Sequence, residues 1–287
     1  MKAIRTSWTT LDSLRAMVNS PAAAAPAAPG SNRLRISAGA AAAGLFTIAR
    51  KLSSVVQLVR IAFTYVMAPL AASAERQDRR QVADIYAYAT RLISAIALPL
   101  AAVLAAGSSS LLSLFGDQAQ GAQAALITLL FARAAEAVLG ISAPVLQVVA
   151  AFRHQLTASI FGVAVALGTG WLIVGHLDPL TGVTLATATG LVVMAAVPML
   201  QLAVTEKLQP FDAQFPGVAL RGIVITLAAG ATAQFASRLP DPVALPLIVA
   251  IAAGSIWLAL RFALPLSDRT SLGKTGRALR LFQREAS

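Results

Sequence analysis

The chain has 287 residues, of which 57% are hydrophobic and 12% charged, with a formal net charge of +11 and no cysteine. Soluble domains contain about a quarter charged residues, so this composition excludes an ordinary soluble domain and indicates a protein surrounded by lipid. The lack of cysteine excludes disulfides and thiolate metal sites, and two histidines without a ligand pattern predict neither a metal site nor a cofactor.

The N-terminal residues precede the first predicted helix. Residues 1–20 have no continuous apolar stretch because charged residues interrupt them, so they do not resemble a signal peptide. Residues 21–30, PAAAAPAAPG, are a proline-rich segment that is unsuited to a helix, since proline removes backbone donors. We therefore expect residues 1–32 to be a disordered segment or a linker.

Seven hydrophobic stretches follow, each long enough to cross the hydrocarbon core of a bilayer, which takes about 20 residues. Nearly all of them contain Gly or Pro, which is common in membrane helices and uncommon in soluble ones. The predicted spans are approximately 52–73, 92–115, 124–150, 156–175, 180–204, 219–237 and 243–266. The sequence therefore predicts an all-α fold, a polytopic transmembrane helix bundle of about seven spans.

Basic residues alternate between the predicted connections. Residues 75–91, 151–155 and 205–218 and the C-terminal tail contain Lys or Arg, whereas 116–123 contains none. Because basic loops stay in the cytoplasm, this pattern predicts a multi-pass protein with a cytoplasmic C-terminus. The same placement makes anionic membrane lipids, and not nucleic acid, the expected partners of the net charge.

The N-terminus conflicts with this topology. Seven spans and a cytoplasmic C-terminus put the N-terminus outside, yet residues 1–35 contain several basic residues. The stretch 36–49 is too short to span a bilayer comfortably. It is interpreted either as a re-entrant stub or as the N-terminal continuation of the first span. We interpret the conflict as a helix missing upstream.

The connection 75–91 is amphipathic, with one apolar helical face formed by Val82, Ile85, Tyr86 and Ala89. We predict that it lies along the cytoplasmic interface before the second span. The basic C-terminal segment 271–287 is a second candidate of this kind. Both are interpreted as membrane anchors.

Polar residues inside the first span are the first candidates for function. An ionisable group in hydrocarbon is costly unless it faces water or a partner. Arginine stays charged and donates bidentate hydrogen bonds to phosphate, so polar residues on one face predict a path for an anionic substrate. For Arg50 and Lys51 the alternative is a helix end with side chains that reach the interface. Steps of three and four residues place on one helical face Arg50, Ser53, Gln57, Arg60 and Thr64.

The third span contains a cation and an acid three residues apart, Arg133 and Glu136. Residues at this spacing pair along a helix, which lowers the cost of burying either charge. Arg133 is a further candidate for the substrate path. Glu136 is either a structural ion-pair partner or a titrating group that couples ion movement to transport. Gln147 and Gln234 are expected to form hydrogen bonds between helices.

Residues 44–80 resemble a recurring stretch of bacterial polysaccharide flippases in the multidrug/oligosaccharidyl-lipid/polysaccharide exporter superfamily. The likeness extends over about residues 33–210. It depends on the order of several short motifs, namely Ala43-Gly44-Leu45, Ala49-Arg50-Lys51-Leu52, Pro69, Leu98-Pro99, Leu114-Phe115-Gly116 and, after Pro144, the ending VLQVVAAFRHQ.

Family members have two six-helix lobes, often followed by two further helices, which makes fourteen spans. The resemblance therefore implies a partial second-lobe transmembrane bundle at 33–210. It implies two additional C-terminal helices at 211–266 and a basic cytoplasmic tail at 267–287.

The resemblance also implies a function. It implies flipping of a sugar repeat, bound to undecaprenyl pyrophosphate, across the bacterial inner membrane during lipopolysaccharide or exopolysaccharide biosynthesis. It implies a transporter and not an enzyme, and the short loops contain no catalytic motif. Because the family's substrate path lies between two lobes, it implies as partner either a missing N-terminal lobe or a second copy.

Two alternatives stay open. One is a small-molecule exporter of the multidrug branch. The single acid at mid-membrane depth and the small number of aromatic residues are arguments against it. The other is an inactive fragment of a transporter.

Overall fold

The computed structural model describes residues 30–75, 79–149, 152–173, 176–272, 279 and 281. The chain divides into residues 1–40 and 41–287, and the account below concerns the second unit, apart from the start of its first helix. The described secondary structure is helical throughout, and seven helices are long and apolar enough to span a membrane. The predicted all-α transmembrane bundle is confirmed. Of the predicted linker 1–32, only residues 30–32 are described, and they are helical.

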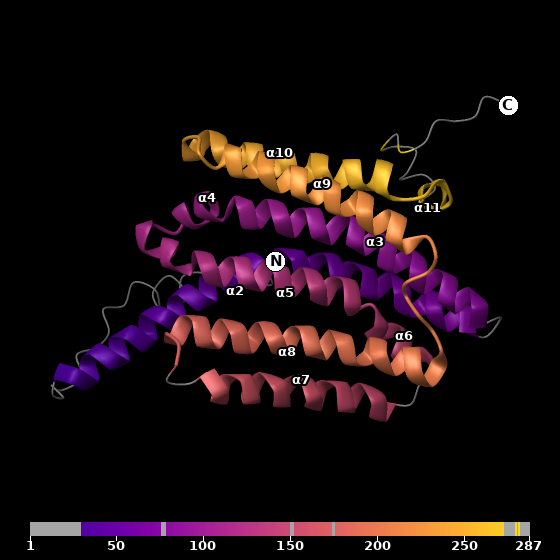
Figure 1. Ribbon diagram of the computed structural model, residues 1–287, viewed down its shortest axis with the longest axis horizontal. Coiled ribbons are helices and arrows are strands. Elements are labelled where there is room, and N and C mark those ends of the chain that lie inside the picture. The colour runs from indigo at the N-terminus through magenta and orange to yellow at the C-terminus, as the bar shows by residue number, and fades with distance from the viewer. Residues whose placement is uncertain are drawn as a thin grey trace, which may run out of the picture. The chain divides into compact units, whose positions relative to one another are not determined.

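Helices joined by short connections, such as α7 and α8 or α9 and α10, run antiparallel, whereas the longer connection 207–214 leads from η2, after α8, across the bundle to α9 (Figure 1). The segment η1 is a 3-10 helix, and η2 and η3 are π-helical turns. The elements are α2 (Gly30–Glu75), α3 (Arg79–Ala106), α4 (Ser108–Ser113), η1 (Asp117–Ala122), α5 (Gln123–Leu139), α6 (Ser142–Val149), α7 (Phe152–Ile173), α8 (Pro179–Gln201), η2 (Leu202–Glu206), α9 (Phe215–Ala236), α10 (Asp241–Leu258), η3 (Ala259–Ala263) and α11 (Leu266–Ser271).

Within residues 41–287 the long helices pack side by side in an order that differs from their order in the chain. Helix α7 packs on α8, α8 on α5, α5 on α3, and α3 on both α9 and α10 (Figure 1). The main core centres on α3 and α5, and α2 contributes Ala49 and Val56 to it. Many of the core residues are alanines, whose small side chains let membrane helices approach closely.

Helices α7 and α8 approach each other at two glycines. A Cβ added to Gly190 would lie 2.7 Å from the Cβ of Ala166, and one added to Gly162 would lie 2.8 Å from the Cβ of Met194. No larger side chain fits at either glycine without movement of a helix. The two glycines therefore set the spacing of this helix pair.

Hydrogen bonds between side chains also join α7 and α8. The Thr189 hydroxyl donates to Thr169 at 3.3 Å, and the Gln201 amide donates to Thr157 at 2.8 Å. Gln147 and Gln234, which the sequence indicated for such bonds, are exposed instead.

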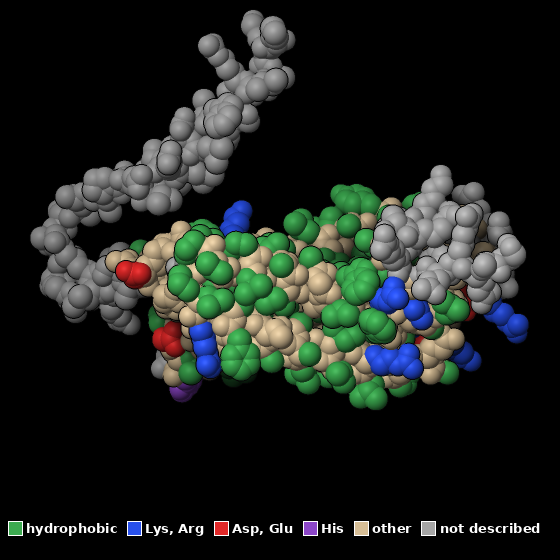
Figure 2. All heavy atoms as spheres, turned by 90° about the horizontal axis from the view of Figure 1, so that it is seen from above, with side chains coloured by type: hydrophobic (Ala, Val, Ile, Leu, Met, Phe, Trp, Pro, Cys, Tyr) green, Lys and Arg blue, Asp and Glu red, His purple; other side chains and the backbone are tan. Residues whose placement is uncertain are grey.

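The outward faces of several helices are covered by large apolar side chains. Trp171 on α7 is 84% exposed, and Leu227 on α9 and Val249 on α10 are each 68% exposed. Figure 2 shows hydrophobic side chains across the middle of one face, with most of the visible Lys and Arg toward one end. A surface of this kind is stable against acyl chains and not against water.

The first span begins earlier than predicted. Helix α2 is continuous from Gly30 to Glu75, and its membrane-compatible part is Gly39–Val66. The stretch 36–49 is therefore the N-terminal continuation of the first span and not a re-entrant stub. Arg50 and Lys51 lie inside this helix, so the interpretation that they mark a helix end is wrong.

The amphipathic segment 75–91 is not a separate interfacial helix. Helix α3 begins at Arg79 and runs without a break to Ala106. The apolar face of its first turns is buried in the bundle, with Val82 and Ala89 fully inaccessible and Tyr86 1% exposed. Packing against the core gives this face more contact than a membrane interface would, so the segment extends the second span.

Candidate functional site

A cluster of one acid and two arginines joins α2 to α5. Arg133 Nη1 donates to Glu136 Oε2 at 2.6 Å, and Arg60 Nη2 lies 3.2 Å from Glu136 Oε1. The side chains of Arg133 and Glu136 are 9% and 6% exposed, whereas that of Arg60 is 22% exposed. We call Arg60, Arg133 and Glu136 the arginine–glutamate cluster. Its formal charge is +1, and it lies between helices that qualify as membrane spans.

A glycine next to the cluster leaves room for Arg60. Helix α5 ends at Leu139, and the amide of Gly140 donates to the Glu136 carbonyl at 2.7 Å. A Cβ added to Gly140 would lie 3.1 Å from Cδ of Arg60. A Cβ at this position would meet the Glu136 carbonyl oxygen first and would also crowd Arg60, so a glycine here keeps both close contacts possible.

Both guanidinium groups of the cluster have an unused donor. Nε of Arg60 and Nε of Arg133 are buried, and neither has a hydrogen-bond acceptor among the described residues. A buried donor left unsatisfied costs about 1–3 kcal/mol, and more when the group is charged. The cluster therefore keeps capacity to bind a further acceptor, either water or an anion.

The structure brings together only part of the predicted polar stripe on α2. Arg50 is exposed and lies about 15 Å from Arg60 along the helix axis. Gln57 and Thr64 are half-buried, and the Thr64 hydroxyl donates to the Arg60 carbonyl at 3.0 Å. Within the described stripe, Arg60 is the residue that forms an ion pair with another helix.

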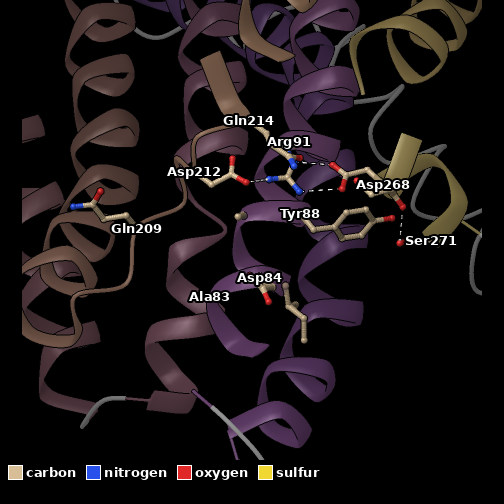
Figure 3. A pocket seen from close by; sticks show the side chains of 12 residues that line it. Ala83, Asp84, Tyr88, Arg91, Gln209, Asp212, Gln214, Asp268 and Ser271 are labelled. Carbon is tan, nitrogen blue, oxygen red and sulfur yellow. Dashed lines mark hydrogen bonds and ion pairs between the residues drawn. The ribbon is translucent and has the colours of Figure 1, made fainter. Parts of the chain in front are cut away.

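A second ion cluster, which the sequence did not indicate, centres on Arg91 of α3 (Figure 3). Arg91 donates to both carboxylate oxygens of Asp268, from Nε at 2.7 Å and from Nη2 at 3.0 Å. Its Nη1 pairs with Asp212. Arg91 and Asp268 are both buried, with 7% of each side chain exposed. We call Arg91, Asp212 and Asp268 the Arg91 cluster, and its formal charge is −1.

The Arg91 cluster ties three segments together at one end of the bundle. Asp268 comes from α11 and Asp212 from the connection before α9, where its carboxylate also accepts the Phe215 amide at 3.0 Å. A cavity of 490 Å³ adjoins the cluster and is lined also by Asp84, Gln209 and other polar residues (Figure 3). Described residues from the predicted segments 75–91 and 205–218 and from the start of the tail, among them Asp84, Gln209 and Ser267, thus line one cavity.

Sequence reasoning missed this cluster for a physical reason. The segment that contains Arg91 was interpreted as a surface connection, and its partners Asp212 and Asp268 lie 121 and 177 residues further along the chain. Helical periodicity reports only on neighbours within a helix. Among the described residues, no group of three or more His, Cys, Asp or Glu could bind a metal ion.

Part of the chain matches a known protein family. Residues 36–124 match the sequence model of a family described as "Polysaccharide biosynthesis protein". The match begins in α2 and ends in α5, so it includes Arg60 and Arg91 but not Arg133 or Glu136. No curated protein and no solved structure matches the chain. Over these residues the match confirms the resemblance to polysaccharide biosynthesis proteins, and it supports a role in polysaccharide biosynthesis or export.

Proposed function

We propose that this chain, a member of a polysaccharide biosynthesis family by its residues 36–124, flips a lipid-linked oligosaccharide across the bacterial inner membrane. The observation behind the proposal is the arginine–glutamate cluster, in which two guanidinium groups share one carboxylate between spanning helices. A carrier such as undecaprenyl pyrophosphate presents phosphate oxygens. Arginine binds these by charge-assisted, often bidentate, hydrogen bonds and stays charged at any physiological pH.

In this proposal Arg60 makes the first contact with the phosphate, because its side chain is the most exposed of the cluster. The phosphate displaces Glu136 from Arg60, and Arg133 keeps Glu136 paired. No charge is then left alone at bilayer depth, where an unpaired charge would be costly. The lipid tail stays in the bilayer. Glu136, the acid of the cluster, is the group available to couple this exchange to an ion.

The test is replacement of Arg60 in the natural host. With the chromosomal copy deleted, Arg60→Ala should lower surface polysaccharide at least about tenfold, since one charge-assisted hydrogen bond is lost. Arg60→Lys should retain an intermediate level, because the charge remains and the bidentate geometry does not. Protein amounts should stay normal, since Arg133 and Glu136 remain a neutral pair. Lys51→Ala, on an exposed position of the same helix, is the control.

Wild-type polysaccharide in cells with Arg60→Ala at a normal protein level would overturn the proposal. An equal loss with Lys51→Ala would also count against it, because any charge change on α2 would then suffice. Working in the natural host keeps any companion lobe or second copy present. Fractionation of the same cells tests the proposed inner-membrane location.

A further inference from the structure

A cavity of 670 Å³ lies between α9, η3 and α11, apart from both ion clusters. Three arginines line it, Arg221, Arg261 and Arg269, together with apolar side chains that include Leu220 and Val224. None of its lining residues is acidic. The cavity therefore combines concentrated positive charge with an apolar wall.

The cavity lies where the apolar surface of α9 approaches its polar end. Arg221 is exposed and lies about 9 Å along the axis from the start of α9. On the same helix, Leu220, Val224 and Leu227 are 67%, 60% and 68% exposed. The basic end of the hydrophobic face is visible in Figure 2. In a bilayer this boundary corresponds to the level of the headgroups.

Two of the three arginines are positioned by the surrounding chain. The guanidinium carbon of Arg261 lies 5.4 Å from the ring centre of Trp257 and 5.7 Å from that of Phe262, within the range of cation–π attraction. Arg269 donates from Nη1 to the Leu281 carbonyl at 3.3 Å.

Arg269 also keeps a free donor. Its Nε is buried and has no acceptor among the described residues. Asp268, the adjacent residue, binds Arg91 and does not line this cavity. Successive residues of α11 thus serve two different sites.

We infer that this cavity binds the phosphate of an anionic membrane lipid, with the acyl chain along the exposed apolar face of α9. Guanidinium groups bind phosphate oxygens, and basic groups at this level attract a headgroup with net negative charge more strongly than a zwitterionic one. The apolar wall favours a lipid over a soluble phosphate, since a soluble anion would leave that wall in water. The inference does not depend on the proposed transport function.

Trp257 is a natural reporter for this site because its ring contacts Arg261. Trp8→Phe and Trp171→Phe together leave Trp257 as the single tryptophan of the chain. In phosphatidylcholine nanodiscs, a small fraction of phosphatidylglycerol with brominated acyl chains should quench Trp257 more strongly than the same fraction of brominated phosphatidylcholine.

Substitutions of the lining arginines test whether this cavity causes the preference for phosphatidylglycerol. Arg221→Gln should weaken the relative affinity for phosphatidylglycerol about fivefold, and Arg221→Gln with Arg269→Gln about 25-fold. Arg221→Lys should keep most of it. The matched control is Arg238→Gln, because Arg238 is exposed like Arg221 but lies just beyond the opposite end of α9.

Equal quenching by the two lipids would overturn the inference, as would a preference that survives in the double variant. Loss of the preference on addition of millimolar inorganic phosphate would show that a soluble anion occupies the cavity, which also overturns it. If the double variant does not fold, as judged by its circular dichroism, the exposed single variant Arg221→Gln decides.

Discussion

The three residues of the arginine–glutamate cluster are not equivalent, because two cations share one anion. Glu136→Gln leaves the buried Arg133 and the partly buried Arg60 without a counter-charge and should destabilise the chain by about 3–5 kcal/mol. Arg133→Met leaves Glu136 paired with Arg60 and should cost less. The measurement is the thermal unfolding midpoint of each purified variant in detergent. Equal midpoints for the two variants would contradict this assignment of charges.

Single residues also show what a sequence can and cannot predict. The contact between Arg133 and Glu136 was predicted, because residues three apart on a helix face the same way. The contact between Arg60 and Glu136 was not, since it depends on how α2 packs against α5. The spacing within one helix predicts on which face of that helix a residue lies, but not which residue of another helix it contacts.

At the scale of elements, Arg91 fastens α11 and the connection before α9 to α3. Arg91→Ala removes the partner of two carboxylates and should destabilise the chain by about 3 kcal/mol. It should also speed proteolysis within residues 207–214, which limited digestion in detergent would detect. Arg238→Ala, at an exposed position, is the control and should leave the digestion rate unchanged. Wild-type resistance of the Arg91 variant would show that other contacts hold these segments.

Asp178 fixes the start of α8, where its carboxylate accepts the Thr181 amide at 3.0 Å. Hydrogen bonds from Thr181 lower the pKa of Asp178 below its ordinary value of 3.8. Because the pKa of Asp178 is lower in the folded state than in the unfolded state, the charged carboxylate stabilises the fold above the unfolded-state pKa. This stabilisation is lost as the pH falls through the folded-state pKa. Asp178→Ala should therefore melt below the wild type at neutral pH, with a difference that shrinks below about pH 4.

Asp178→Asn supplies the comparison for this prediction. An asparagine oxygen still caps the helix but does not titrate, so its melting temperature should depend less on pH in this range than that of the wild type. A difference between Asp178→Ala and wild type that stays constant down to about pH 3 would contradict the role of the charged carboxylate.

The sequence predicted the number of spans well and their boundaries less well. Apolar stretches of sufficient length are a strong signal, and all seven correspond to candidate spans. At 36–49 the sequence left two alternatives open, of which the continuation of the first span is confirmed, and at 75–91 the predicted interfacial helix is wrong. An amphipathic pattern has the same period whether its apolar face meets a membrane interface or a protein core. Only the buried positions of Val82 and Tyr86 distinguish the two.

At the scale of the whole molecule, the absence of cysteine makes topology directly testable. Single cysteines at the exposed positions Asp84 and Gln209 should react with an impermeant thiol reagent only after the inner membrane is permeabilised. Cysteines at Gln118 and His176 should react from outside. This result is expected because basic connections stay in the cytoplasm. Reaction of Gln209→Cys and Gln118→Cys from the same side would contradict the predicted orientation.

The order in which helices pack was beyond prediction from one sequence. Helices α7 and α8, which are neighbours in the chain, pack together, but α3 packs on α9 and α5 packs on α8 across long separations in the chain. These pairings decide where Arg60 and Arg91 find their partners. The sequence could therefore indicate which types of residue belong to a site, but not how they are arranged in space.

The glycine contacts between α7 and α8 restrict how this chain can vary. Since Gly190 has room for no methyl group while Ala166 is opposite, a neutral change would have to exchange the two, Gly190→Ala with Ala166→Gly. Either change alone separates the pair or opens a void. If these contacts form during membrane insertion, α7 and α8 would enter the bilayer as a packed pair. Helix α7 would then already be attached to α8 when the rest of the bundle assembles.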